Sequence, residues 1–154
     1  FTYTAWINPR TGGEKGGGRI INKGNGSFVV QKKWTIRYAG IEIALRRSTR
    51  DSYFNTVSNS ITMGSWQFLA VTYNGTTGNG KLYRGIANGN VTEMIGNGGD
   101  SGAGSFISDA EWPMLIGNAI TNDRTFDGLI DEVRIYNRVL NRSELQSVMN
   151  TPVG

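Results

Sequence analysis

Several residues that could take part in binding or catalysis lie near the C-terminal end of the chain, in the stretch TFDGLIDEVRIYNRVL at residues 125–140. Alternate side chains of a strand point to opposite faces, so this stretch predicts two rows. The row that we expect to face a core consists of Leu129, Asp131, Val133 and Ile135. An ionised carboxylate on an apolar face is costly unless it is paired, hydrogen-bonded or bound to a metal. Asp131 should therefore have a partner.

The chain lacks the residues and spacings of the common hydrolytic sites. Retaining glycoside hydrolysis needs two carboxylates roughly 5 Å apart, one as nucleophile and one as acid/base. No Glu residue has the neighbouring acids that this chemistry needs, and the adjacent Asp131 and Glu132 would face opposite sides of a strand. His and Cys are absent, which removes Ser-His-Asp, Cys-His and His-based zinc chemistry. We therefore predict no catalytic residues and a protein that is not an enzyme.

Length and turn signals predict one all-β domain. The chain has 154 residues, and a domain of about 150 residues buries roughly 70% of the surface that its unfolded chain exposes. It contains 22 glycines, and Asn-Gly pairs begin at residues 25, 74, 79, 88 and 97. Turn signals at such intervals are expected for many short strands joined by tight loops.

Two segments show how the strands should be covered. Residues 1–8 alternate apolar and polar side chains, which places Trp6 in the polar row. Residues 66–73 are apolar on both faces, as in a central strand that is covered on both sides. We therefore assign Trp66 and Phe68 to packing.

A short helix should end the domain. It is expected from residue 141 to about 149, with Asn141 as the N-cap and Glu144 at the third helical position. This spacing is typical of a capping box.

Six short motifs follow one another along nearly the whole chain. They are FTYTAWINP at residues 1–9, RIINKG at 19–24, WQFLAVTYNG at 66–75, GKLYRG at 80–85, PMLIGNA at 113–119 and FDGLIDEVRIYNRVL at 126–140. Together they resemble the laminin G-like, concanavalin A-like lectin/glucanase family. The resemblance implies a two-sheet antiparallel β-sandwich of the jelly-roll type with a short C-terminal helix, as a single domain over residues 1–154.

The chain departs from the family's pattern at two places. Members usually have another strand before the FTYTAW-like one, and this sequence begins at Phe1 without it, so either the chain is a fragment or a sheet has a vacant edge. Unpaired backbone groups line such an edge, so we predict that residues 1–8 or the neighbouring edge pair with another chain or with the tail at 150–154. The strand ending at Tyr83 runs into RGIANG where the family normally has a Val-Asn-Gly turn, which predicts a longer hairpin.

The resemblance also implies a structural calcium site. Asp131 would supply a carboxylate and loop carbonyls most of the other ligands, which suits calcium because it takes six to eight oxygen ligands. Asp127, just before the same strand, is expected to join the ion or to solvate a turn. The alternative for Asp131 is that it accepts hydrogen bonds from backbone amides or pairs with an Arg.

Four residues are candidates for contact with a sugar. Aromatic rings stack on the apolar face of a pyranose while polar side chains bond its hydroxyls. Trp6, Arg134 and Tyr136 fall on the row opposite the core row of their own strand, which we expect to form the exposed face of one sheet. Arg37, beside a loop, is a further candidate. The alternative for Trp6 is that it fills space between the sheets.

The distribution of charge limits the classes of binding partner that we expect. The net charge is +4, and residues 31–50 hold six bases against Glu42 alone. Such an excess attracts polyanions or forms a solvated hairpin. No nucleic-acid motif accompanies it, so we expect no specific nucleic-acid partner, and an acidic or sulfated glycan fits the fold better. No apolar run approaches the roughly 18 residues of a membrane span.

These features favour a non-catalytic binding module for carbohydrate, either an acidic or a neutral polysaccharide, within a larger secreted or cell-surface protein. The alternative is a structural or adhesive module that contacts protein and binds no glycan. An exposed aromatic platform with polar neighbours would favour the first, and an exposed apolar patch of several hundred Å² the second.

Overall fold

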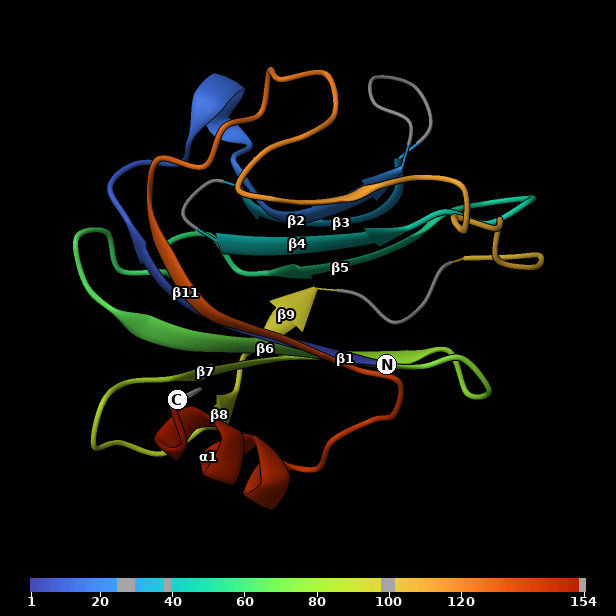
Figure 1. Cartoon of the computed structure of the whole chain (residues 1–154). Coiled ribbons are helices and arrows are strands. Elements are labelled where there is room, and N and C mark those ends of the chain that lie inside the picture. The colour runs from blue at the N-terminus through green and yellow to red at the C-terminus, as the bar shows by residue number, and fades with distance from the viewer. Residues whose placement is uncertain (25–29, 38–39, 98–101, 153–154) are drawn as a thin grey trace.

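The computed structural model describes residues 1–24, 30–37, 40–97 and 102–152, without the side chains of residues 30–35, 37 and 97. In this part of the chain, strands form two stacked antiparallel sheets and one α-helix packs on the outer side of one of them (Figure 1). The elements are β1 (Thr2–Pro9), η1 (Glu14–Gly16), β2 (Arg19–Gly24), β3 (Val30–Arg37), β4 (Gly40–Leu45), β5 (Ser52–Thr56), β6 (Gln67–Asn74), β7 (Asn79–Gly85), β8 (Thr92–Glu93), β9 (Gly96–Asn97), β10 (Met114–Ile116), β11 (Gly128–Tyr136) and α1 (Arg142–Asn150).

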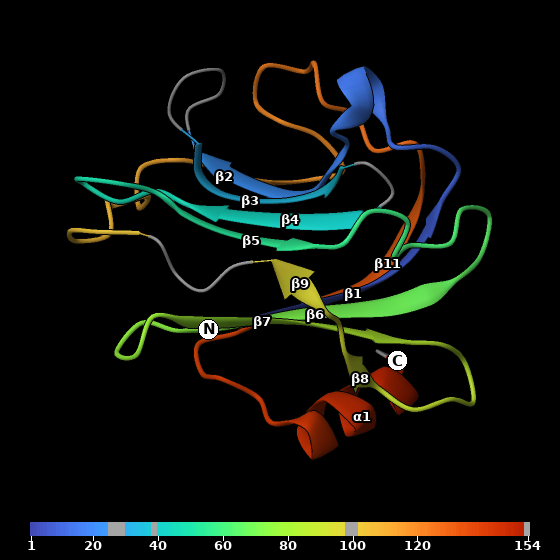
Figure 2. The same ribbon diagram turned by 180° about the vertical axis from the view of Figure 1, so that it is seen from behind.

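The two sheets have different sizes and a jelly-roll-like order. The five-stranded sheet runs β11-β1-β6-β7-β8 and the six-stranded sheet runs β10-β2-β3-β4-β5-β9. Every neighbouring pair is antiparallel. The predicted all-β sandwich with a short C-terminal helix is confirmed, and Figure 2 shows the same layers from behind.

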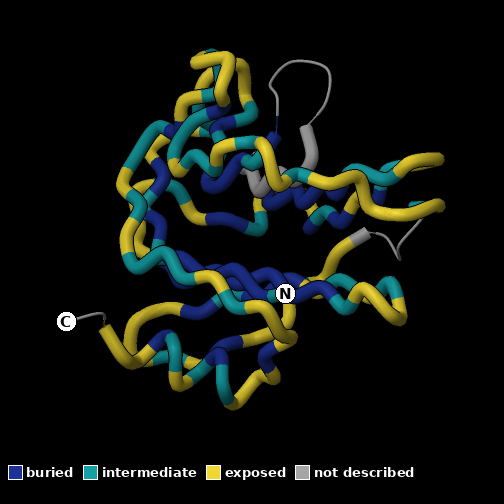
Figure 3. Tube along the Cα trace, turned by 45° about the vertical axis from the view of Figure 1, so that its right-hand side comes forward, coloured by how far each residue is buried: buried dark blue, intermediate teal, exposed yellow. Residues whose placement is uncertain are grey.

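The main core lies between the sheets. It is built from alternate residues of the facing strands, among them Ile7, Ile20, Ile43 and Leu69, each at most 3% exposed. Figure 3 shows this buried layer running through the middle of the molecule, with exposed segments at the loops. The alternation of β1 and β4 therefore directs one face of each strand inward.

A second apolar cluster lies on the outer face of the five-stranded sheet, under α1. It contains Phe68, Ala70, Tyr83, Val91, Leu140, Leu145 and Met149. β6 is thus covered on both sides, as predicted, by the six-stranded sheet on one face and by the helix on the other. A Cβ on Gly85 would collide with the Met149 sulfur, so glycine at this position lets the helix approach the sheet.

The N-terminus of α1 has the predicted capping box. The Glu144 backbone N–H donates to Asn141 Oδ1 at 3.0 Å, and the Asn141 N–H donates to Glu144 Oε2 at 2.8 Å. These two bonds satisfy amide groups that a helix otherwise leaves unpaired. The cap fixes where the helix begins, and Leu145 and Met149 then face the sheet.

A β-bulge interrupts β11. Thr4 of β1 pairs with Arg134 and Trp6 pairs with Asp131, so two residues of β11 face Ala5 alone. A bulge inserts one extra residue into a strand, and one residue of shift moves every following side chain to the other face.

The bulge overturns the prediction that one row of β11 faces the core. Glu132 lies in it with φ of 53°. Ile130 before the bulge and Val133 after it both pack against the main core. Leu129 and Asp131 are exposed instead. Asp131 therefore lies on the outer face beside its cross-strand neighbour Trp6 and is exposed, so its carboxylate is not buried in the core.

Of the two edges predicted to be available, residues 1–8 are not an edge, whereas the strand next to them is. β1 lies between β11 and β6, and β11 is the first strand of the five-stranded sheet. The reason is that the C-terminal strand returns to pair with the N-terminal one. β11 is therefore one of the edge strands of the described structure, with β8 at the other edge of the same sheet.

Candidate functional site

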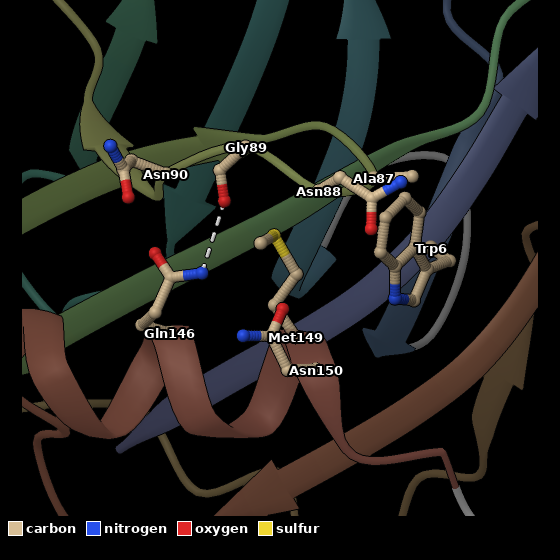
Figure 4. Close-up of a pocket in the computed structure, with 8 residues that line it drawn as sticks. All are labelled: Trp6, Ala87, Asn88, Gly89, Asn90, Gln146, Met149 and Asn150. Atoms are coloured by element: carbon tan, nitrogen blue, oxygen red, sulfur yellow. Dashed lines mark hydrogen bonds between the residues drawn. The ribbon is translucent and has the colours of Figure 1, made fainter.

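The outer face of the five-stranded sheet is only partly covered by α1. The helix has nine residues and so is about 13 Å long, whereas β1 has eight residues and extends about 26 Å. Next to the helix lies a cavity of about 570 Å³ (Figure 4). The lining of this Trp6 cavity consists of Trp6, Ala87, Asn88, Gly89, Asn90, Gln146, Met149 and Asn150.

Trp6 forms the aromatic wall of the cavity. It comes from β1, is half-buried, and meets the fully buried Phe68 edge to face at a centroid distance of 5.9 Å. Packing against Phe68 holds the indole in place, because an edge-to-face pair has a preferred geometry. The rest of the ring lines the cavity (Figure 4).

The loop between β7 and β8 forms another wall of the cavity, and α1 anchors it. Gln146 Nε2 donates to the Gly89 carbonyl at 3.1 Å, and the Val91 N–H donates to Gln146 Oε1 at 2.7 Å. Arg142 Nε donates to the Val91 carbonyl at 2.6 Å. Both ends of the Gln146 amide are thus engaged with backbone, which makes Gln146 a positioning residue.

The same loop turns tightly at Asn88, which has φ of 60°. The Gly89 N–H donates to the Ile86 carbonyl at 2.9 Å and closes the turn. Asn tolerates this left-handed backbone better than most residues. The loop is therefore held before any ligand arrives.

Three amide side chains stand at the rim. Asn88, Asn90 and Asn150 are exposed, and within the described residues the structure gives their side chains no hydrogen-bond partner. Each amide offers two N–H donors and one carbonyl acceptor. The cavity therefore combines one aromatic surface with several free donors and acceptors.

The other predicted ligand residues of β11 support the helix. Arg134 Nη1 donates to the Val148 carbonyl at 3.1 Å, and Nη2 donates to Glu132 Oε2 at 2.8 Å and to the Thr151 carbonyl. Tyr136 packs against the cluster under α1. Arg134 and Tyr136 do share the outer face with Trp6, as predicted, but the expectation that this face is exposed is wrong for the part that the apolar side of α1 covers.

Arg37 lies on the other sheet. Its backbone pairs with Gly40 in the hairpin of β3 and β4, and its side chain lies outside the described residues. The structure therefore does not bring Arg37 together with Trp6.

The two predicted metal ligands have local partners. Asp131 Oδ1 accepts the Glu132 N–H at 2.8 Å, which agrees with the alternative of a backbone amide donor. Asp127 Oδ2 accepts the Thr11 hydroxyl at 2.8 Å, and Asp127 Oδ1 lies 3.4 Å from Arg10 Nη1.

Asp127 and Asp131 are not brought together. Four residues of extended chain separate their Cα atoms by about 13 Å. In the described part of the chain, no three acidic residues gather as a metal site would need. Calcium binding stays a prediction; it requires the melting temperature of the wild type to be higher in calcium than in chelator, and Asp131→Asn to remove the difference.

Sequence reasoning missed the rim amides and misjudged one tryptophan. Asn88, Asn90 and Asn150 come from a loop and a helix, and the departure of RGIANG from the family's turn was the one available signal. Trp66, assigned to packing, is 40% exposed. It precedes β6, which begins at Gln67, so it lies outside the covered part of the sheet.

Two antiparallel sheets in this order, with a helix packed on one outer face, define a lectin-like β-sandwich domain. The family model described as the concanavalin A-like lectin/glucanases superfamily, in its laminin G form, matches residues 1–146. The chain therefore belongs to this superfamily.

Solved structures share the fold at low sequence identity. The CBM40 module of a Ruminococcus gnavus IT-sialidase, solved with α2,3-sialyllactose bound, is 17% identical with a TM-score of 0.71, over 99% of this chain and 82% of that one. A heptameric SAP-like pentraxin of Limulus polyphemus is 15% identical with a TM-score of 0.58, over 96% and 68%.

A curated relative also covers nearly the whole chain. It is the adhesion G-protein coupled receptor V1 of Danio rerio, 26% identical over 162 residues, which include 99% of this chain and 2% of the receptor. The chain thus spans a very small part of that relative.

Proposed function

We propose that this domain is a non-catalytic carbohydrate-binding module and that a saccharide occupies the Trp6 cavity. The observation that carries the proposal is the meeting of a half-buried indole with three unbonded amide side chains in one cavity. A pyranose has an apolar face that stacks on an aromatic ring and hydroxyls that pair with amides. The volume of about 570 Å³ lies within the range of roughly 300–1,000 Å³ typical of small-molecule sites.

Two further observations support a binding role. The fold is shared with a carbohydrate-binding module that was solved with a sialylated sugar. No acidic residue lines the cavity, whereas glycoside hydrolysis by the usual route needs two carboxylates at the scissile bond. The site therefore suits binding without covalent chemistry.

The proposed setting is a larger secreted or cell-surface protein. In the described residues, no helix has the length and apolar character to cross a membrane. The match to a laminin G-type model and to one segment of an adhesion receptor supports an extracellular setting.

Affinity electrophoresis tests the function. Wild type, Trp6→Ala and Trp66→Ala would be run through gels containing dextran, galactomannan, xylan, alginate or chondroitin sulfate. Wild type should be retarded by at least one polysaccharide, and Trp6→Ala should lose that retardation. Trp66→Ala is the matched control, because Trp66 is also a partly exposed tryptophan but does not line the cavity. Free migration of wild type in every gel, or equal retardation of Trp6→Ala, would contradict the proposal.

The edge strand favours a second candidate function, contact with protein. β11 is open on one side, and Leu129 and Ile135 are 57% and 48% exposed. Backbone pairing and these side chains would suit an added strand from another chain. Light scattering that shows a monomer, together with rapid hydrogen exchange along β11, would count against self-association through this edge.

A further inference from the structure

We infer that the Trp6 cavity selects neutral saccharides and excludes sialylated, uronic and sulfated ones. This inference rests on the proposed function and names its ligand class. Its first basis is the lining, which consists of one tryptophan, one methionine, amides and small residues and includes no charged side chain. An acidic sugar bound there would lose water without gaining a cation, which is unfavourable.

Two arginines that bond to sequence neighbours of the lining residues hold the helix and the loop in place. Arg134 pairs with Glu132 at 2.8 Å and donates to the Val148 and Thr151 carbonyls at the end of α1. Arg142 donates through Nε to the Val91 carbonyl. Arg134 would have to leave its acceptors to bind an anion in the cavity, and neither arginine lines it.

One acidic side chain lies beside the cavity. Asp131 pairs directly with Trp6 across β11 and β1 and is exposed. Side chains that pair in this way are about 5 Å apart at Cβ. The negative charge of Asp131 repels a carboxylate or a sulfate bound against the indole.

The basic residues that favoured an acidic glycan lie on other strands and loops. Arg46 pairs with Asp51 at 2.8 Å. Arg47 donates to the Ser52 hydroxyl at 2.9 Å, to the Gly104 carbonyl at 3.0 Å and to the Tyr73 hydroxyl. These contacts tie loops together at the β4–β5 side of the molecule, and none of these residues lines the Trp6 cavity.

The test compares the binding of neutral and acidic probes at physiological salt. Binding that persists in Trp6→Ala is subtracted, because it does not depend on the cavity. Neutral probes are dextran, galactomannan, xylan and lactose; acidic probes are alginate, chondroitin sulfate and 3′-sialyllactose. We expect Trp6-dependent binding among the neutral probes, and binding of the acidic ones to be weaker by about tenfold or more. Trp6-dependent binding that is tighter for the acidic probes would overturn the inference and leave the proposed function intact. Absence of Trp6-dependent binding to all probes would overturn the proposed function itself.

A gain-of-charge variant tests the electrostatic cause. Ala87 is exposed and lines the cavity, so Ala87→Arg places a cation where the wild type has none. It should raise affinity for the acidic probes by about tenfold, as expected of one charge-assisted hydrogen bond. Ser147→Arg on the exposed side of α1 adds the same charge outside the cavity and should not do so. Equal gains in both variants, or no gain in either, would contradict the inference.

Discussion

The two faces of the five-stranded sheet are covered to different extents. The inner face meets a second sheet, and its side chains join one continuous core that includes Ile7 and Leu69. The outer face meets only a nine-residue helix, and its cluster around Phe68 and Leu145 is much smaller. A surface that a partner element does not fully cover leaves room for a ligand. The same sheet thus provides stability on one face and a cavity on the other.

Truncation of one core side chain on each face of the sheet should show the largest difference between the two faces in the free energy of unfolding. Leu69→Ala in the main core should cost about 2–5 kcal/mol in the free energy of unfolding, through lost burial and a residual cavity. Leu145→Ala, on the side of α1 that faces the sheet, should lower the free energy of unfolding by less than Leu69→Ala does. The reason is that the short helix can move toward the sheet and fill the space. Urea denaturation measures both. A larger loss for Leu145→Ala would contradict the view that the outer cluster is secondary.

A methyl group at Gly85 should disturb the packing of α1 on the outer face of the sheet and leave the packing of the inner face unchanged. Gly85→Ala collides with the Met149 sulfur, so the helix must shift, at a cost of about 1–3 kcal/mol. Because Met149 lines the cavity, Trp6-dependent saccharide binding should fall as well. Gly75→Ala is the control, since its added carbon meets its nearest neighbour, a Phe106 ring atom, at 3.8 Å. Denaturation curves and affinity gels of both variants check this.

Loss of the Gln146 amide should weaken the cavity with a smaller effect on folding. Gln146→Ala removes the hydrogen bonds to Gly89 and Val91, which together contribute about 1–3 kcal/mol. The loop would then be ordered only on binding, so saccharide affinity should fall more than stability alone explains. Ser147→Ala is the matched helix control. Calorimetric titration that finds unchanged affinity for Gln146→Ala would show that the loop needs no anchor.

Lowering the pH should change stability less than any of these substitutions, because the carboxyl that it titrates lies on neither face of the sheet. At the loop end, the hydrogen bond from Lys15 at 2.7 Å lowers the pKa of Asp123 to about 2. A carboxyl whose pKa is lower in the folded state adds stability above its unfolded pKa near 3.8, and this contribution is lost as the pH falls toward 2.

Melting temperatures of wild type and Asp123→Asn measured from pH 5 to 2 test this assignment. The melting temperature of the wild type should fall by more than that of the variant over the lower part of this pH range. Saccharide binding should be flat across neutral pH, because no titratable side chain lines the Trp6 cavity. A binding transition near neutrality would point to another site.

Local patterns were read correctly where one element alone decides them. The capping box at Asn141 and Glu144 places the helix, and the double apolar character of β6 predicts cover on both sides. The alternation in β1 also places Trp6 on the outer face. Each of these depends on residues close together in the sequence, whose geometry the backbone fixes.

Features that depend on two distant segments were not predicted. The bulge opposite Ala5 arises where β11 pairs with β1, and it moves Asp131 from an expected core row to the outer face. Trp66 is exposed because β6 begins one residue later. A single residue of register therefore changed the role assigned to each of these side chains.

From the sequence by itself, the resemblance of six motifs to a known family implied the antiparallel sandwich. Periodicity and caps determined the terminal helix and the row that holds Trp6, because they act within a few residues. Only the tertiary structure decided that the helix covers part of the outer face and anchors the Asn88 loop beside Trp6. A cavity is space between elements, and its shape depends on how far apart packing holds them. That separation is a property of the whole fold, which no local pattern encodes.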